Sequence, residues 1–129
     1  MKHLKVGRKF SREKKQREAM LKTMLGDLLV KRKMNTTLAK AKELKSIAEK
    51  AIGQLKKAPS FRVAKSRLPK NVTPAILKEI IEKTASRNSG YTRITKRGRR
   101  LSDSAEMAKI EIIEDAPKPV AEDKKTDKK

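Results

Sequence analysis

The residues with the strongest chemical character in this sequence are arginines and lysines gathered in one short stretch. Residues 90–100 (GYTRITKRGRR) hold the only tyrosine of the chain together with Lys96, Arg97, Arg99 and Arg100. Guanidinium and ammonium groups match the oxygens of phosphate, whereas their burial without a counter-charge is costly. The stretch therefore predicts an exposed surface that binds an anionic partner.

The whole chain is strongly cationic, which extends this interpretation. Its 129 residues include 36 Lys and Arg against 15 Asp and Glu, for a formal net charge of +21. Self-repulsion of this size destabilises a compact free state, so we expect a polyanion as partner, with nucleic acid as the first candidate. Aromatic residues make up only 2% of the chain, too few to line a stacking track for single-stranded bases. A protein that reads phosphate positions and duplex shape is favoured.

Patterns typical of enzymes and metal sites are missing from the sequence. His3 is the only histidine and Cys is absent, which excludes paired-histidine metal sites, His-based triads, thiolate chemistry and disulfides. Gly98 lacks the spacing and the Lys-Ser/Thr pair of a phosphate-binding loop. We expect no enzymatic activity, no cofactor, no metal and no small-molecule substrate.

The apolar runs are short, none longer than the type seen at residues 28–30. We therefore expect neither a transmembrane helix nor a signal peptide. A chain without cysteine is compatible with a reducing cytosol. The sequence predicts a cytoplasmic protein without a membrane partner.

Two helices separated by a strand are predicted in the first half of the chain. Ser11 is a good helix cap, and apolar residues recur after it at helical spacing, which predicts a helix over residues 12–31. The segment of residues 34–38 is short and contains adjacent threonines, which favours a strand. A second apolar stripe predicts a helix over residues 38–55.

Two further helices are predicted before residues 90–100. Residues 60–67 follow a proline and favour a short third helix, although a basic mobile loop fits them equally well. Thr73 followed by Pro74 predicts the start of a fourth helix, since threonine caps and proline is tolerated at the first position. The run from Asn88 to Gly90 is expected to end that helix.

The basic stretch of residues 90–100 is itself predicted to begin with a strand. Side chains alternate with period two along a strand, so Thr92 and Ile94 face a core while Tyr91, Arg93 and Thr95 face outward. The sequence leaves the role of Tyr91 open between packing and contact with the partner.

A last strand is predicted over residues 107–113, paired antiparallel with the strand that begins at Thr92. Residues 97–100 then belong to a projecting loop between the two strands. Arg93 lies across from Glu111 in such a pair, so it either forms a cross-strand ion pair or contacts the partner.

These elements predict an α+β fold: one small two-layer domain over residues 11–115, with helices packed on a short three-stranded sheet. The order is helix, strand, three helices, two strands. Residues 1–10 form a basic arm, either frayed in solvent or, as the net charge favours, ordered along phosphates when bound. Residues 116–129 are expected to be a disordered charged tail.

Several segments stand in the order of a known family: residues 1–3 (MKH) with 7–8 (GR), Arg17 with 19–21 (AML), 36–44 (TTLAKAKEL), 90–94 (GYTRI), and Asp103 with 107–108 (MA). Over residues 1–114 the chain resembles ribosomal protein seventeen of the bacterial large subunit. The resemblance implies a non-catalytic α+β domain bound to large-subunit rRNA. It also implies a position near the outer opening of the peptide exit tunnel, beside neighbouring ribosomal proteins.

The basic stretches and the resemblance together define a set of candidate RNA contacts in the arm, the helices and the final hairpin: Lys2, His3, Lys5, Arg8, Lys9, Arg12, Arg17, Lys40, Arg62, Arg67, Tyr91, Arg93, Lys96, Arg97, Arg99 and Arg100. The expected role is to bind and cross-brace rRNA. A histone-like DNA-binding protein is the alternative, because both functions gain affinity from counterion release. A membrane-binding peptide ranks last, since no helix sets bulky aromatics against lysines.

Overall fold

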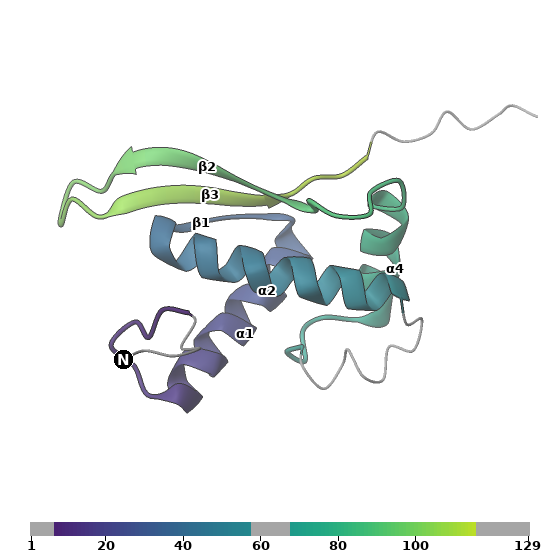
Figure 1. The fold of residues 1–129 in the computed structure, drawn as a ribbon, viewed down its shortest axis with the longest axis horizontal. Helices are drawn as coiled ribbons and strands as arrows, with labels where there is room; N and C mark the ends of the chain where they lie inside the picture. Colours follow the sequence, from purple (N-terminus) through teal and green to yellow (C-terminus); the bar gives the residue numbers. More distant parts are fainter. Residues whose placement is uncertain (1–6, 58–67, 116–129) are drawn as a thin grey trace, which may run out of the picture.

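Three helices and three strands form the part of the chain that the computed structural model describes, residues 7–57 and 68–115. In chain order they are α1 (Lys14–Lys31), β1 (Lys33–Thr37), α2 (Leu38–Lys57), α4 (Pro74–Lys83), β2 (Thr92–Arg99) and β3 (Glu106–Ile112). The strands form one antiparallel sheet in the order β1-β3-β2, and α1 and α2 pack on one side of it (Figure 1). The predicted α+β class is confirmed. The start of the arm, the predicted helix at 60–67 and the tail at 116–129 lie outside the described residues.

Helix α1 begins later than predicted, at Lys14, because Ser11 does not cap it. A capping residue has an extended backbone, whereas Ser11 has a φ of +50°. Glu13 takes the cap position without a side-chain hydrogen bond. At the other end, Arg32 is left-handed with a φ of +65° and its N–H donates to the Leu28 carbonyl at 2.9 Å. This turn sends the chain directly into β1, whose prediction is confirmed.

Helix α2 supplies the centre of the core, and its predicted apolar stripe is confirmed by the buried residues Leu38, Ala41, Leu44, Ala48, Ile52 and Leu55. The stripe packs against the second half of α1, against α4 and against the sheet. Side chains from all of these elements reach full burial, among them Leu28, Leu29, Leu44, Ile52, Ile80 and Ile110. Aliphatic side chains from elements far apart in sequence therefore form one core.

Helix α4 starts as predicted but ends earlier. The Ile76 N–H donates to the Thr73 hydroxyl at 3.5 Å, which confirms Thr73 as the cap. The helix stops at Thr84, whose buried hydroxyl donates to the Ile80 carbonyl at 2.7 Å. Gly90 is left-handed at φ +69°, as expected, but it precedes β2 instead of closing α4.

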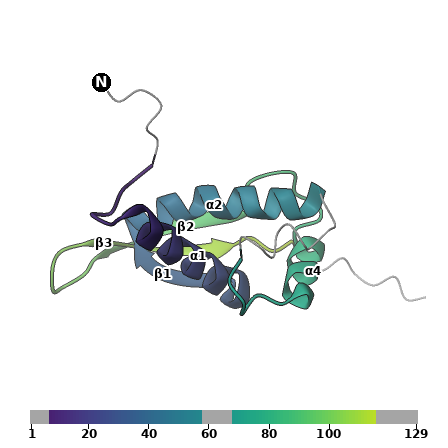
Figure 2. The same ribbon diagram turned by 90° about the horizontal axis from the view of Figure 1, so that it is seen from below.

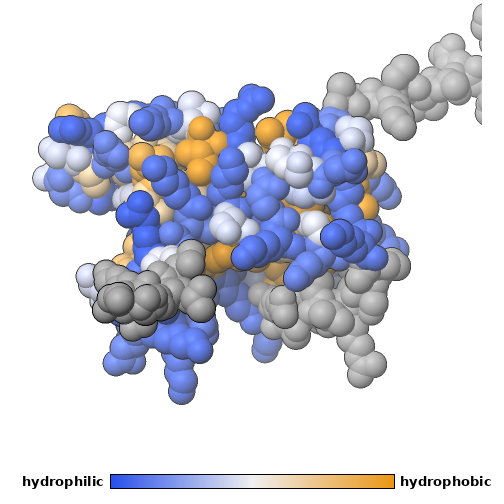
Figure 3. All heavy atoms as spheres, viewed as in Figure 1, coloured by the Kyte–Doolittle hydropathy of each residue, from blue (hydrophilic) through white to orange (hydrophobic). Residues whose placement is uncertain are grey.

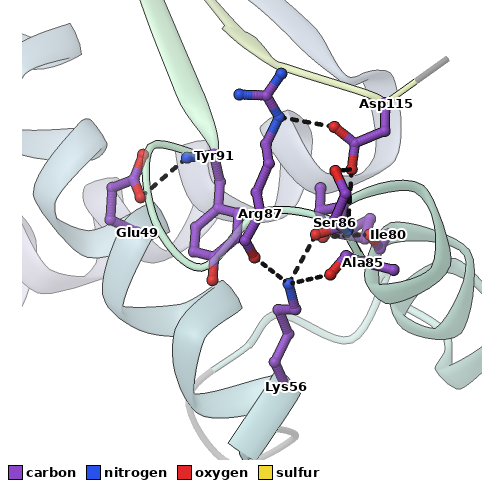
Figure 4. Close-up of polar contacts among 9 residues, drawn as sticks. Glu49, Lys56, Ile80, Ala85, Ser86, Arg87, Tyr91 and Asp115 are labelled. Carbon is purple, nitrogen blue, oxygen red and sulfur yellow. Dashed lines mark hydrogen bonds and ion pairs between the residues drawn. The ribbon is translucent and has the colours of Figure 1, made fainter.

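A polar junction joins the end of α4 to α2 and to the start of β2 (Figure 4). Lys56 donates to the carbonyl oxygens of Thr84, at 2.7 Å, and of Arg87. Its ammonium nitrogen also lies 5.1 Å from the centroid of the Tyr91 ring. Tyr91 is only 4% exposed and donates its hydroxyl to the Asn88 carbonyl at 2.9 Å. The expectation that Tyr91 faces outward is wrong, because its ring completes this junction.

The first residues of β2 are held by a carboxylate from α2. Glu49 accepts hydrogen bonds from the N–H groups of Tyr91 at 3.1 Å and Thr92 at 2.8 Å, and from the Thr92 hydroxyl at 2.7 Å. Thr92 is 3% exposed and Ile94 packs against the core. The predicted inward orientation of these two residues is confirmed.

The hairpin of β2 and β3 is antiparallel as predicted, but β2 is longer than expected. It runs to Arg99, with a bulge between Lys96 and Gly98. Gly98 has a φ of +91°, a conformation that lets a strand absorb one extra residue without ending. The prediction of a loop beginning at Arg97 is therefore wrong, and the connecting segment is 100–105.

Candidate RNA interface

The far end of the hairpin is exposed and cationic. Every residue of 95–104 is exposed. The bulge leaves Arg97 without a cross-strand partner, since Lys96 opposes Ala108 and Gly98 opposes Met107. Within the described chain, Lys96, Arg97 and Arg99 take no part in the ion pairs. Their charges are available to a partner.

Arg100 has a different role, because it closes the hairpin loop. Its guanidinium donates to both carboxylate oxygens of Asp103, at 2.9 and 2.6 Å, and its backbone N–H donates to the Ala105 carbonyl at 2.9 Å. The hydrogen bond from Arg100, followed by that from the Ala105 N–H, lowers the pKa of Asp103 from 3.8 to about 2. The charge of Arg100 is thus offset within the loop.

A second cationic group lies at the base of the arm and the start of α1. Arg8 Nε lies 3.8 Å from a carboxylate oxygen of Glu43 on α2. Arg17 donates to the Arg12 carbonyl at 3.4 Å, and the first turn of α1 holds no acid. Cations are unfavourable at a helix N-terminus, and a docked phosphate would reverse that cost.

Two hollows bring the hairpin and the arm together at the start of α2. The larger, of about 340 Å³, is lined by Arg8, Thr37, Leu38, Ala39, Lys42, Ala105 and Glu106. The smaller, of about 170 Å³, is lined by Leu38, Lys96, Gly98, Arg99, Glu106 and Met107. Because both share Leu38 and Glu106, they lie on either side of these residues. Figures 1 and 2 show the arm base and the hairpin tip at one end of the molecule.

The structure therefore groups some of the candidate contacts and separates others. Arg8, Lys96 and Arg99 line the two hollows. Lys40 is half-buried in the first turn of α2, next in sequence to Ala39, which lines the larger hollow. Tyr91 is buried and offers little surface to RNA. Lys2, His3, Lys5, Arg62 and Arg67 lie outside the described residues.

Arg93 lies apart from this end, on the side of the sheet opposite the helices. It opposes Glu111 in the register, as predicted. Of the two alternatives for Arg93, the ion pair with Glu111 is not formed, and the Glu111 carboxylate pairs with Lys109 of its own strand. The hydrogen bond from Lys109 is the main cause that lowers the pKa of Glu111, and the charges of Arg93 and Lys33 lower it further.

Three basic side chains at the opposite end of the molecule, Arg32, Lys83 and Arg87, are paired with acids of the same chain. Arg32 and Lys83 both contact Glu79, at 2.9 and 2.8 Å, and Glu114, at 3.5 and 3.3 Å. Arg87 contacts Asp115 at 2.9 Å (Figure 4). Figure 3 shows hydrophilic and hydrophobic side chains mixed at both ends of this view, so hydropathy does not distinguish the two ends.

The sequence analysis did not single out three lysines that the structure places near the candidate contacts. Lys42 lines the larger hollow, while Lys33 and Lys109 flank Glu111 on the open side of the sheet. Strand alternation alone would have placed the latter two on a polar face, but their neighbours depend on the strand order. In residues 7–57 and 68–115, no helix has the length and apolar character needed to span a membrane, and no metal-ligating cluster assembles.

Comparison with known proteins points to one family. A family model described as ribosomal protein L17 matches residues 20–113. The chain is 40% identical to the large ribosomal subunit protein bL17 of Pelobacter propionicus, over 94% of this chain and 98% of that protein. It is 38% identical to the bL17 protein of Thermodesulfovibrio yellowstonii, over 100% of this chain and 98% of the relative.

Proposed function

Because the chain belongs to the ribosomal protein L17 family and is a structural, non-enzymatic constituent of the large ribosomal subunit in the bacterial cytoplasm, we propose that it binds and cross-braces the large-subunit rRNA. In this proposal it lies near the outer opening of the peptide exit tunnel, beside neighbouring ribosomal proteins. The observation that carries the proposal is the convergence of the hairpin cations Lys96 and Arg99 with the base of the arm around the start of α2; within residues 7–57 and 68–115 these hairpin cations have no ion-pair partner.

The proposed mechanism is charge neutralisation from a folded scaffold. Lys96, Arg97 and Arg99 project from a hairpin anchored in the core, so they reach phosphates at a fixed distance from the arm. Arg12, just before α1, and Arg17, in its first turn, present a second group. Each contact with a phosphate releases counterions and positions the protein without reading sequence. Two cationic groups on separate elements can hold two RNA helices together, which is what cross-bracing requires.

The proposal also assigns roles along the chain. Residues 1–10 act as a basic arm that orders along phosphates, and Lys2, His3 and Lys5 extend the contacts of Arg8 and Lys9. Residues 11–115 act as the rRNA-binding domain, with Arg62 and Arg67 as further contacts. Residues 116–129 are a charged tail with no assigned contact. DNA compaction is disfavoured as the alternative, since the relatives are named as ribosomal proteins.

The test replaces Arg97 and Arg99 together with Gln and measures binding to transcribed large-subunit rRNA across a salt series. Loss of two phosphate contacts should lower the slope of log K against log salt by about 2. The matched control replaces Lys45 and Lys50, which are exposed on α2, and removes the same charge from a different surface. Equal effects of the two pairs would contradict the proposed interface.

A second measurement addresses cross-bracing itself. Hydroxyl-radical footprinting of the rRNA with the wild-type protein should show protection on RNA helices that are separate in the secondary structure. Protection confined to one continuous helix would remove cross-bracing from the proposal while leaving RNA binding in place.

A further inference from the structure

The side of the sheet that faces away from the helices is polar and cationic. Lys33, Glu111 and Arg93 lie in one row across the three strands, and Asn35, Lys109 and Thr95 lie in the next. Lys33, Asn35, Arg93 and Thr95 are exposed, while Lys109 and Glu111 are partly exposed. The alternate residues Ala108, Ile110 and Ile112 are buried on the opposite side. These two rows of the open face therefore consist of hydrogen-bonding and charged side chains.

The charges on this face are not balanced. Glu111 is the single carboxylate of these two described rows, and it pairs with Lys109. Lys33 and Arg93 oppose Glu111 from the two edge strands, and neither appears in an ion pair within the described chain. Two positive charges thus remain uncompensated. Adjacent strands are about 4.8 Å apart, so these two backbone positions are separated by about 10 Å.

The chemistry of the face favours the backbone of a nucleic acid over its bases. No aromatic residue stands in either row, which excludes the stacking on splayed bases by which some sheets bind single-stranded RNA. Lysine and arginine bind phosphates, and Asn35 and Thr95 can hydrogen-bond phosphate oxygens or ribose hydroxyls. Figure 1 shows α1 and α2 on the other side of the sheet, so they do not cover this face.

We infer that the open face of the sheet is a second RNA-binding surface, on which Lys33, Arg93 and Lys109 contact the sugar-phosphate backbone of a duplex segment while Glu111 offsets part of their charge. The surface is distinct from the hairpin tip and the arm base. It rests on the proposed function, since the RNA is that of the large subunit. Charge complementarity and the polar row beside the cations identify the occupant.

The test uses the full chain and transcribed large-subunit rRNA. Lys33→Gln with Arg93→Gln should lower the slope of log K against log salt by about 2. Lys45→Gln with Lys50→Gln is the control of equal charge. Glu111→Gln should instead tighten binding severalfold, because it removes a negative charge that faces the phosphates. Impaired folding does not produce tighter binding, so this variant separates the proposal from a purely structural role.

The outcomes distinguish this inference from the proposed function. No specific binding by the wild-type protein would overturn both. The second surface alone would be overturned by one combination of results. RNA binding would be weaker in Arg97→Gln with Arg99→Gln, but in Lys33→Gln with Arg93→Gln it would match the control. If the sheet pair binds RNA like the control but enters subunits poorly in competition with wild type, the face contacts a protein and the inference is wrong.

Discussion

At the scale of single residues, Glu49 has a larger structural role than its surroundings in sequence indicate. It accepts three hydrogen bonds from Tyr91 and Thr92 at the start of β2. Thr92 is 3% exposed, so its hydroxyl has little access to water as a substitute. Loss of a partner leaves buried donors unsatisfied, which costs more than the bond contributes when formed.

We predict that Glu49→Gln lowers the free energy of unfolding by about 1–3 kcal/mol, because the uncharged amide cannot accept all three bonds equally well. Urea denaturation followed by far-ultraviolet circular dichroism measures the change. Glu43→Gln is the control on the same helix. Its 3.8 Å pair with Arg8 is partly exposed, and such pairs contribute about 0–1 kcal/mol. Equal losses in the two variants would argue against a special role for Glu49.

Asp103 gives a prediction about pH. Its folded-state pKa is about 2, against an ordinary 3.8, and the main cause is the hydrogen bond from Arg100. A lowered pKa means that the pairing stabilises the loop above the ordinary value and that this stabilisation is lost as the pH falls towards 2. Carboxyl-carbon NMR should show Asp103 titrating near pH 2, with Arg100→Gln returning the midpoint towards 3.8. The same midpoint in both proteins would refute the assignment.

At the scale of elements, two glycines in helix interiors should respond in opposite ways to alanine. A Cβ at Gly26 of α1 would clash with the Pro69 ring and lie 3.0 Å from Asn71 Oδ1, whereas at Gly53 of α2 it would meet nothing within 4 Å. The close approach of the segment around Pro69 therefore requires glycine in α1 only.

Gly53→Ala is expected to raise the free energy of unfolding by about 0.5–1 kcal/mol, because alanine is the better helix former. Gly26→Ala is expected to lower it by about 1–3 kcal/mol through overpacking. Thermal and urea denaturation of both variants give the comparison. A gain in stability at Gly26 would show that the Pro69 segment yields without cost.

The interiors of the elements and some of their ends, such as the start of α4 at Thr73, were predictable from the sequence, but the ends of α4 and β2 were not. Apolar spacing identified α1, α2, α4 and both strands of the hairpin, since periodicity is a local property. The ends depend on contacts from elsewhere: α4 stops where Lys56 of α2 binds the carbonyl groups of its last turn and beyond. The bulge at Gly98 likewise lengthens β2. The local sequence, a glycine among arginines, does not distinguish a turn from a β-bulge.

The candidate interface followed the same division. Net charge predicted an anionic partner, and the basic hairpin was recognisable in the sequence. Which cations remain available was not, because pairs such as Arg32 with Glu79 join residues far apart in the chain. Tyr91 was misplaced for a related reason, since only the fold shows that Lys56 and Asn88 surround it.

At the scale of the whole molecule, charge is distributed unevenly. Acids pair with Arg32, Lys83 and Arg87 at the α4 end, while Lys96, Arg97 and Arg99 of the hairpin form no ion pair with the residues that the structure describes. With a net charge of +21, repulsion in the free protein should be relieved by salt.

We predict that raising the salt concentration from about 0.05 to 0.5 M increases Tm by roughly 4–8 °C, equivalent to about 1 kcal/mol. Calorimetry on the free protein measures this. The increase should be smaller in Arg97→Gln with Arg99→Gln, which has less charge to screen. A fall in Tm would mean that the ion pairs around α4, which salt weakens, dominate the balance.

The buried position of Tyr91 has a practical consequence. The chain has one Tyr and no Trp, so its intrinsic fluorescence and the tyrosine band of its near-ultraviolet circular dichroism come from a single ring. That ring lies beside Lys56 of α2 and just before the first residue of β2, at the opposite end of the strand from the hairpin tip (Figure 4). Unfolding should therefore change the signal, whereas RNA docking at the hairpin should leave it nearly constant. The molecule carries an internal optical reporter that separates loss of structure from loss of binding in the hairpin variants.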